Sequence, residues 1–257
     1  MKSSRKQAIV LTAKRGATSP TGSKFGGEPY FPKTMDYPHN ANGEPLRLLA
    51  QLNFAELPHL ADFPEQGILQ FFIANNVFYG ADFDDMPHSQ AVQDGFRVIF
   101  HQEILPESER LMTFPEPAGE DYFPLRAEFT VTGELGTSII SLENHDFEKI
   151  FIKKYKQITG EEIEGHWDLE DDECELLYDT FGNENHQIGG YPSFTQDDIR
   201  MDDTYEPLLF QMTSQDNEND NAFDILWGDV GVANFFIPID KLRTLDFSDV
   251  LYNWDCS

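Results

Sequence analysis

The chain has 257 residues, of which 40% are hydrophobic and 22 are phenylalanine, and its formal net charge is −28. This composition excludes a disordered chain, and no apolar run reaches the roughly eighteen residues of a membrane-spanning helix. The acidity disfavours nucleic acid and membranes as partners, because phosphate binding depends on lysine and arginine. The two cysteines, Cys174 and Cys256, give no disulfide framework. With no clear secretion signal, we expect a cytoplasmic protein.

The charge is distributed unevenly along the chain. Residues 161–229 hold 21 acidic side chains and one lysine or arginine, Arg200. Residues 1–33 hold seven lysines and arginines against one acid, Glu28. The acidic region favours a basic protein or a cation as a partner. The alternatives are a solubilising surface and an adaptation to salt.

In chain order, the first 24 residues are basic and rich in glycine, serine and threonine, which predicts a loosely held arm. Four segments then have the apolar or alternating pattern of strands, and these are residues 48–54, 68–74, 96–101 and 126–132. The last two alternate apolar with polar residues, as in an antiparallel sheet with one solvated face. The four prolines from Pro106 to Pro124 predict a loop between them.

The clearest helix is predicted over residues 145–159, between a capping Asn144 and a terminating Gly160. Its apolar residues fall on one stripe, which consists of Phe147, Ile150, Phe151, Tyr155 and Ile158. The remaining elements are a helix or strand at 176–181, a polar loop at 213–222, a short helix at 239–245 and a final strand at 250–254. These elements predict a mainly β protein with a few helices (α+β) and mostly antiparallel sheets.

Two parts of the chain carry the same landmarks in the same order. The first series starts at Gly26 with a diglycine and a nearby proline, and continues with a Pro-Leu pair, a glutamine and a strand containing two adjacent phenylalanines. The second series starts at Gly189, 163 residues later, which is too long a period for a solenoid. We therefore predict a basic arm at 1–24 and a single, internally duplicated pseudo-twofold domain at 25–257. Its repeats lie at about 25–80 and 188–257.

The segments Ser23–Pro32, Pro45–Phe54, Gly67–Phe72 and Gly189–Pro192 resemble the bacterial YwqG family. The resemblance spans nearly the whole chain and is most specific over residues 23–72. It implies a single β-rich domain with a few helices and an internal duplication, and it implies no catalytic residues. Some members of that family are encoded beside contact-dependent toxin systems, which implies an immunity-type role.

Several amides interrupt otherwise apolar strands. Gln51 and Gln70 in the first repeat match Gln211 and Asn234 in the second. Burying an amide costs about 1–3 kcal/mol unless it forms hydrogen bonds. We therefore expect a pseudosymmetric polar network at the interface of the two repeats. This network either holds the backbone there or forms a small-molecule site.

One loop has acidic residues spaced like the start of a calcium-binding loop. An EF-hand is excluded, because its sixth position is Asn221 instead of glycine and its twelfth is Trp227 instead of glutamate. A looser divalent-cation site and a solvated hairpin both remain open. The residues that would bind the cation are Asp216, Glu218, Asp220 and Asp224. We expect no other cofactor, and we find no catalytic motif.

The sequence favours a monomeric, non-enzymatic interaction protein whose acidic region binds a basic protein, for example a toxin with a cationic substrate-binding face. Asp171, Asp172 and Glu173 are the residues that we expect to contact this partner. The alternative is a protein that binds a small molecule or a divalent metal, or an enzyme, with its site at the interface of the repeats.

Overall fold

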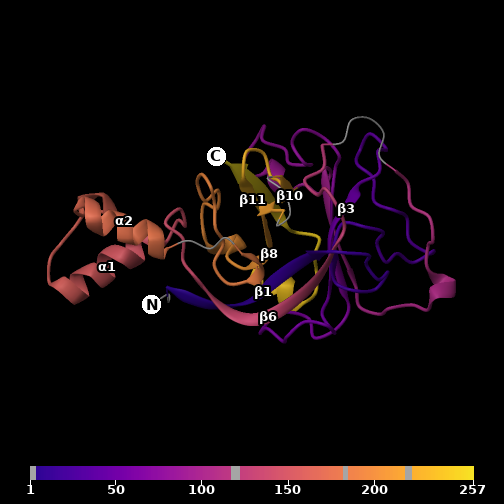
Figure 1. Cartoon of the computed structure of the whole chain (residues 1–257), viewed down its shortest axis with the longest axis horizontal. Helices are drawn as coiled ribbons and strands as arrows, with labels where there is room; N and C mark the ends of the chain where they lie inside the picture. Colours follow the sequence, from indigo (N-terminus) through magenta and orange to yellow (C-terminus); the bar gives the residue numbers. More distant parts are fainter. Residues whose placement is uncertain (1–3, 117–121, 182–184, 218–221) are drawn as a thin grey trace.

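Ten strands pair into one antiparallel sheet in the computed structural model, which describes residues 4–116, 122–181, 185–217 and 222–257 (Figure 1). In their order across the sheet, the strands are β12 (Leu251–Cys256), β11 (Gly231–Phe236), β8 (Leu208–Thr213), β7 (His186–Gly189), β1 (Arg5–Arg15), β6 (Phe129–Ile139), β2 (Lys24–Phe25), β3 (Arg47–Asn53), β4 (Ile68–Ile73) and β5 (Phe96–His101). The predicted mainly β, antiparallel architecture is confirmed.

The other elements are short, apart from two helices. Strands β9 (Gln215–Asp216) and β10 (Phe223–Ile225) form a separate hairpin. The helices and 3-10 turns are α1 (Phe147–Thr159), α2 (Asp171–Thr180), α3 (Ile239–Arg243), η1 (Ser89–Ala91), η2 (Glu107–Glu109), η3 (His166–Asp168) and η4 (Asp203–Tyr205). Within the described ranges, none of the helices has the length and apolar character needed to cross a membrane.

Residues 5–15 form a central strand of the sheet, so the expected loose N-terminal arm is wrong for this segment. Strand β1 pairs along its whole length with β6, from Arg5 opposite Ile139 to Arg15 opposite Phe129, and its other edge pairs with β7. Alternation explains the strand, because Ile9, Leu11 and Ala13 are buried in the core while Val10, Thr12 and Lys14 are more exposed. The prediction of a loose arm relied on the basic composition of the segment and overlooked this alternation.

The main core is enclosed by the two halves of the sheet, which face one another. Phe71 of β4 contacts Phe210 of β8, with ring centroids 4.8 Å apart. Even the two edge strands meet across this core, because Phe96 of β5 lies 5.2 Å from Tyr252 of β12. The sheet therefore curls until its edges approach each other, and both halves share one apolar interior.

The adjacent phenylalanines of both repeats point to opposite faces of the sheet, as the period of a strand requires. Phe71 and Phe235 belong to the main core. Phe72 packs in a second cluster under the loops of the first half, and Phe236 packs in a third under the loops of the second half. One residue of each pair therefore meets the core and the other a second layer.

The arrangement of the two halves follows a common plan. Outward from the central β1 and β6, the strands succeed each other in chain order on both sides, as β2 to β5 on one side and β7, β8, β11 and β12 on the other. Both diglycines adopt positive φ, at +66° and +70° for Gly26 and Gly27 and at +67° and +79° for Gly189 and Gly190. The internal duplication itself stays a prediction.

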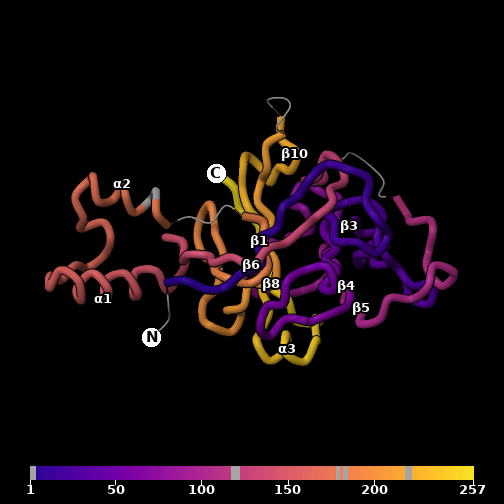
Figure 2. Tube along the Cα trace, turned by 60° about the horizontal axis from the view of Figure 1, so that its bottom comes forward, coloured from indigo at the N-terminus to yellow at the C-terminus, as the bar shows by residue number. Residues whose placement is uncertain are grey.

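Between β6 and β7, residues 141–181 form a helical arm that projects to one side of the sheet (Figure 1 and Figure 2). Helix α1 begins two residues later than predicted and ends at Gly160, whose φ of +81° gives the expected left-handed cap. Phe147 anchors the arm, because it is 1% exposed and packs between Phe151 and Phe181. The segment 176–181, left open as helix or strand, belongs mostly to α2.

Candidate functional site

The three acids predicted to contact a partner lie on the helical arm. Asp171, Asp172 and Glu173 form the first turn of α2, and all three are exposed. Negative charge stabilises the N-terminus of a helix, and the backbone N–H of Glu170 also donates to Glu173 Oε2 (3.3 Å). These residues therefore stabilise the helix, while their contact with a partner stays a prediction.

Large apolar side chains are exposed beside these acids. Leu176 is 66% exposed, and Asp172 and Glu173 precede it by one helical turn. Trp167, in η3 just before α2, is 62% exposed. Trp167 and Leu176 therefore place two large exposed apolar side chains next to acidic residues of η3 and α2.

The other helix of the arm carries the opposite charge. Helix α1 holds four lysines, which are Lys149, Lys153, Lys154 and Lys156. Lys156 forms an ion pair with Glu162, in the segment that connects α1 to η3. The predicted acidic surface is therefore confined on this arm to α2 and the residues just before it.

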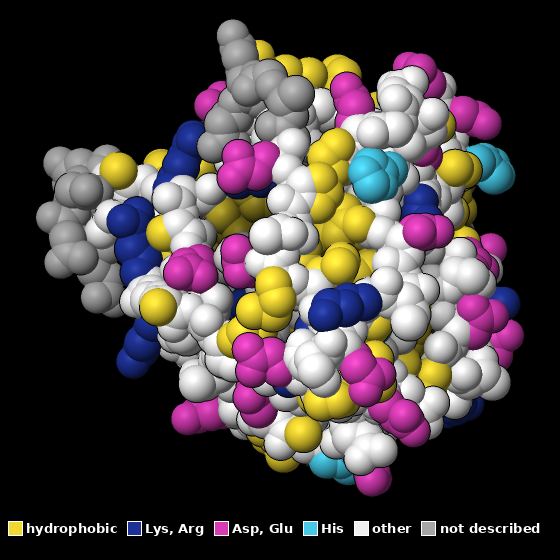
Figure 3. Space-filling view, turned by 90° about the vertical axis from the view of Figure 1, so that its right-hand side faces the viewer, with side chains coloured by type: hydrophobic (Ala, Val, Ile, Leu, Met, Phe, Trp, Pro, Cys, Tyr) yellow, Lys and Arg dark blue, Asp and Glu magenta, His cyan; other side chains and the backbone are white. Residues whose placement is uncertain are grey.

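Part of the acidic region is neutralised by bases from the N-terminal strand. Lys6 Nζ of β1 lies 3.0 Å from Glu206 Oε1, and Arg15 Nε donates to Asp224 Oδ1 at 2.6 Å. On the face opposite the helical arm, acidic side chains are interspersed with basic and apolar ones (Figure 3). Residues 161–229 therefore do not form one uniformly negative surface.

The predicted cation loop is only partly described. Asp216 is exposed on β9, and Asp224 is buried on β10 against Arg15. Glu218 and Asp220 lie outside the described residues. The Asp224 carboxylate already neutralises a guanidinium, so a cation bound to Asp224 would share this carboxylate with Arg15. A loose divalent-cation site formed by Asp216, Glu218 and Asp220 stays a prediction.

The amides of the first repeat form a buried network against the loop after β2. Gln51 and Gln70 are both 0% exposed, and Gln70 Nε2 donates to Gln51 Oε1 at 2.8 Å. Gln51 Oε1 also accepts from the backbone N–H of Tyr30 (2.8 Å), and Gln70 Nε2 donates to the Tyr30 carbonyl (2.6 Å). His101 Nε2 lies 2.8 Å from Gln70 Oε1 and completes the set.

The amides of the second repeat hold their own loop in the same way. Gln211 Oε1 accepts from the backbone N–H of Ser193, and Asn234 Nδ2 donates to the Ser193 carbonyl, each at 2.8 Å. Ser193 is 163 residues beyond Tyr30, which is the offset of the two diglycines. Both amide pairs thus fix one loop residue through its N–H and its C=O.

The expectation of a single network at the interface of the repeats is wrong. Gln70 lies between Leu69 and Phe71 in β4, and both neighbours point into the shared core, so Gln70 points to the outer face. The same alternation places Gln211 on the outer face of β8, which four strands separate from β3 in the sheet order. The main core between the halves is filled by apolar side chains, so these amides do not meet there.

Burial lowers the pKa of three basic side chains in the sheet, Lys24, His101 and His186. Desolvation lowers the pKa of Lys24 to about 8 against the opposing effect of Glu128 and Glu28. Its ammonium donates to the carbonyls of Ser19 (2.8 Å) and Glu28. Burial also lowers the pKa of His101 and of His186 to about 4. These side chains have structural roles in the loops and strands, and none of the three was predicted from the sequence.

A pocket of about 670 Å³ lies at the diglycine turn of the first half. Residues that line it include Gly27, Arg47, Phe123, Arg126 and Glu128. The Arg47 guanidinium stacks 4.0 Å from the centre of the Phe123 ring, so one wall of the pocket is a fixed cation.

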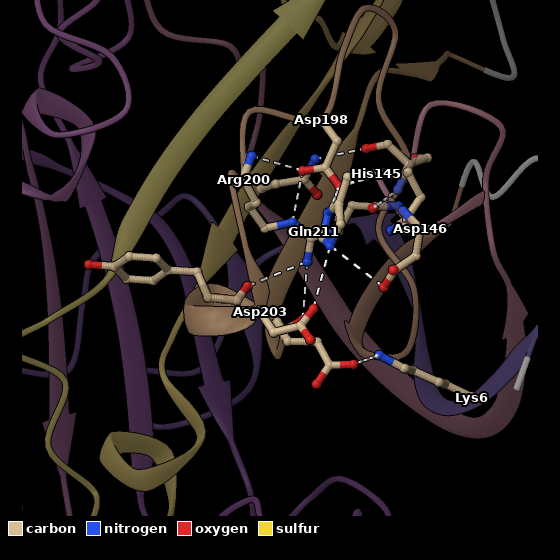
Figure 4. Close-up of polar contacts among 12 residues, drawn as sticks. Lys6, His145, Asp146, Asp198, Arg200, Asp203 and Gln211 are labelled. Atoms are coloured by element: carbon tan, nitrogen blue, oxygen red, sulfur yellow. Dashed lines mark hydrogen bonds and ion pairs between the residues drawn. The ribbon is translucent and has the colours of Figure 1, made fainter. Parts of the chain in front are cut away.

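The most structured polar cluster surrounds His145, at the base of the helical arm (Figure 4). His145 Nδ1 lies 2.9 Å from Asp198 Oδ2, and the backbone N–H of His145 donates to the same oxygen (3.2 Å). Its other ring nitrogen, Nε2, lies 3.6 Å from Asp146 Oδ2 and 3.6 Å from Asp203 Oδ1. Three carboxylates from two distant segments therefore meet at one imidazole.

A buried ion pair supports this cluster. Arg200 donates to Asp198 through Nε (2.8 Å) and Nη2 (2.6 Å), and the two side chains are 2% and 1% exposed. Burial tends to raise the pKa of Asp198, but hydrogen bonds and charge from Arg200, with a hydrogen bond from His145, hold that pKa below its ordinary value. Arg200 also lies 4.5 Å from the centre of the Phe236 ring.

Sequence reasoning missed the His145 cluster, because its members lie 53 residues apart along the chain. One signal was present. Arg200 is the only lysine or arginine among 21 acids, and a lone base in such a stretch is expected to form an ion pair. No pattern in the sequence indicates that His145 comes to the same place.

Comparison with known proteins adds the family of the chain. No curated protein matches the sequence. Residues 23–256 match the profile of a family described as "Domain of unknown function (DUF1963)". The match covers the whole sheet except β1 and includes the helical arm, both amide pairs and the His145 cluster. The chain therefore belongs to the DUF1963 family of domains of unknown function.

Proposed function

We propose that this protein is a non-enzymatic interaction module that binds a basic protein through α2 and η3 of its helical arm. The observation that carries the proposal is the exposure of Trp167 and Leu176 beside the acidic first turn of α2. Exposed side chains of this size on a projecting element are costly in water, and burial against a partner removes that cost.

Charge complementarity indicates the kind of partner. Asp171, Asp172, Glu173 and Glu175 are exposed on α2, and the described residues of η3 and α2 contain no lysine or arginine. Acids around an apolar centre increase the association rate of a cationic partner, while the apolar residues provide most of the affinity. The lysines of α1 repel the same partner, which would orient it on the α2 side.

An immunity-type role is the specific form of this proposal. In that role the partner is a basic toxin, and the arm covers the cationic surface with which the toxin binds its substrate. The resemblance to the YwqG family supports this form, since some members of that family are encoded beside toxin systems. A toxin gene adjacent to the gene of this protein would support it independently.

The test is a pull-down from a lysate of the native host at low salt, with the immobilised protein as bait. The charge-reversed arm variant replaces Asp171, Asp172 and Glu175 by lysine and leaves Glu173, which caps α2, unchanged. The wild-type protein is expected to retain a basic protein, and the arm variant is expected to lose it. Leu176→Ser tests the apolar part of the surface with no change of charge.

The matched control reverses three exposed acids elsewhere, by replacing Asp84, Asp85 and Glu107 by lysine. This control changes the net charge by the same amount and is expected to retain the partner. Circular dichroism checks that each variant keeps its helices. If the wild-type protein retains no basic protein, or if the arm variant retains as much as the control, the proposal is wrong.

We also propose a second candidate function, the binding of a small polar molecule, which the pocket lined by Arg47, Arg126 and three glutamates favours. In this proposal the ligand binds in that pocket and not at the interface of the repeats. Thermal-shift screening with metabolites tests this candidate, since a ligand at a hundred times its dissociation constant stabilises by about 2.7 kcal/mol. A flat response, or one that survives Arg126→Gln, contradicts it.

We propose, finally, that the two halves of the sheet derive from duplication of one unit. The matching strand order, the positive φ of both diglycines and the equivalent hydrogen bonds to Tyr30 and Ser193 support this origin. Family members whose halves are more alike in sequence would strengthen it. Members that lack the diglycine and the amide pair in one half throughout the family would contradict it.

A further inference from the structure

The His145 cluster has the donor set of a transition-metal site. One ring nitrogen and two carboxylate oxygens, from His145, Asp146 and Asp203, all lie within 4.8 Å of one another. Imidazole and carboxylate are common ligands of zinc and related dications. The cluster contains a histidine with a defined orientation, so it differs from a simple group of exposed acids.

The hydrogen bond from His145 to Asp198 defines which ring nitrogen can bind a metal. An ionised carboxylate can only accept hydrogen bonds, so Nδ1 carries the proton and donates to Asp198 Oδ2. Nε2 then presents its lone pair toward Asp146 and Asp203. Metal-binding histidines almost always have this arrangement, in which a carboxylate or carbonyl accepts from the nitrogen that does not bind the metal.

The residue that orients His145 is itself held rigidly. Asp198 receives two hydrogen bonds from the Arg200 guanidinium and one from the Arg200 backbone N–H (3.1 Å). Both side chains are almost completely buried. The position of the imidazole is therefore fixed by the fold, without help from the two carboxylates on its other side.

The spacing of the three donors fits a tetrahedral metal. Bonds of about 2.0–2.2 Å at a tetrahedral angle place neighbouring ligand atoms about 3.4 Å apart. The two distances from His145 Nε2 to the carboxylates are 3.6 Å, longer than a hydrogen bond and close to this value. All three ligand atoms lie within 4.8 Å of one another, and Asp203, 64% exposed, has room to move toward a common metal ion.

We propose that His145, Asp146 and Asp203 bind one zinc-class divalent metal ion, with Asp198 orienting the histidine and a fourth position open to water. The site would join the base of the helical arm, where His145 and Asp146 precede α1, to η4 in the connection between β7 and β8. The competing explanation is a protonated His145 that forms ion pairs with the same carboxylates and binds no metal.

Cobalt(II) titration of the chelator-treated, tag-free protein distinguishes the two explanations. Four-coordinate cobalt has visible d–d absorption bands, which zinc abolishes when it displaces the cobalt. The wild-type protein is expected to bind one equivalent of cobalt with these bands. His145→Gln and Asp203→Asn are each expected to weaken binding at least tenfold. Both residues lie at the surface, so the variants are expected to fold, and circular dichroism checks this.

Two control variants separate this site from the rest of the acidic surface. His39→Gln removes an exposed histidine and Asp216→Asn an exposed acid of the predicted cation loop, and both are expected to bind cobalt like the wild type. Absence of the absorption bands in the wild-type protein would overturn the proposal in favour of the ion pair. Equal binding by the wild type, His145→Gln and Asp203→Asn would overturn it in favour of a different site.

Discussion

Gln70 donates from Nε2 to Oε1 of Gln51, and both side chains are fully buried on the outer face of the sheet. Through this pair the backbone of Tyr30 is held at both its N–H and its C=O. Each polar atom of a buried amide pair that loses its partner is costly in an apolar layer. The loop after β2 and the strands below it therefore form one cooperative unit.

Replacing Gln70 by leucine is expected to be strongly destabilising. The change leaves the Tyr30 carbonyl and His101 Nε2 without their partners, and each buried unpaired group costs about 1–3 kcal/mol. Asn234→Leu is the matched comparison in the second half. It removes the bond to the Ser193 carbonyl, and Asn234 Oδ1 has no partner within the described ranges. Urea unfolding should show a loss about 2 kcal/mol larger for Gln70→Leu, and equal losses would contradict this account.

The second diglycine is expected to tolerate no side chain at its second position. A Cβ on Gly190 would contact Ser138 Oγ and would lie 2.9 Å from Ala8 Cβ, at a φ of +79°. Gly160, which ends α1, has a similar φ of +81° but no atom within 4 Å of its Cβ position. Gly160→Ala should therefore cost only the conformational penalty of about 1 kcal/mol. Gly190→Ala should cost clearly more in the same thermal unfolding assay.

Stability is expected to fall as the pH is lowered toward 4. The pKa of His101 and of His186 is about 4 in the folded protein, against about 6.5 in the unfolded chain. Between these values the unfolded state binds protons that the folded state does not, so acid favours unfolding. Above about pH 6.5 this effect is absent, and below about pH 4 it reaches roughly 3 kcal/mol for each histidine.

Urea unfolding at several pH values, with His186→Gln and with the exposed His39→Gln as control, measures this effect. The slope of stability against pH between about 4 and 6.5 should decrease for His186→Gln and stay unchanged for the control. The slope is the relevant quantity, because the substitution also removes hydrogen bonds and lowers stability at every pH. Equal slopes for all three proteins would show that His186 is not buried in its neutral form.

Breaking the Asp198–Arg200 pair from one side is expected to cost more than removing both charges. Asp198→Asn leaves a guanidinium that is 2% exposed without its counter-charge, at a cost of about 3–5 kcal/mol. The double variant Asp198→Asn/Arg200→Gln removes that penalty, so its loss should be smaller than the sum of the single losses. A double-mutant cycle from chemical unfolding gives the coupling energy. Simple additivity would contradict the structural role assigned to this pair.

Local patterns predicted three strands of the first half of the sheet closely. Residues 96–101 are a strand with the predicted bounds, and the strands at 48–54 and 68–74 differ by one residue. These segments are continuous apolar runs or strict alternations, which depend only on near neighbours. Strand β1 was missed although Ile9 and Leu11 alternate, because the charge of its flanking residues was interpreted as solvent exposure.

The spatial relationships could not be predicted in this way. The amides were identified as a matched set, but their position on the outer face depends on which flanking residues enter the shared core, and that is a property of the whole sheet. His145 meets Asp198 only because the chain leaves β6, forms the helical arm and returns through β7. The isolated charge of Arg200 indicates that it forms an ion pair. Its partner, Asp198, could not be identified in advance, because the conformation of the turn that contains both residues determines the pairing.

The association rate of the retained basic protein, measured over a range of salt concentrations, tests the central claim most directly. The wild-type protein and the control with Asp84, Asp85 and Glu107 reversed should bind at rates that rise steeply as salt is lowered. Reversal of Asp171, Asp172 and Glu175 should slow association at low salt by tenfold or more and flatten its salt dependence. If the arm variant binds as fast as the control at every salt concentration, the helical arm is not the binding surface.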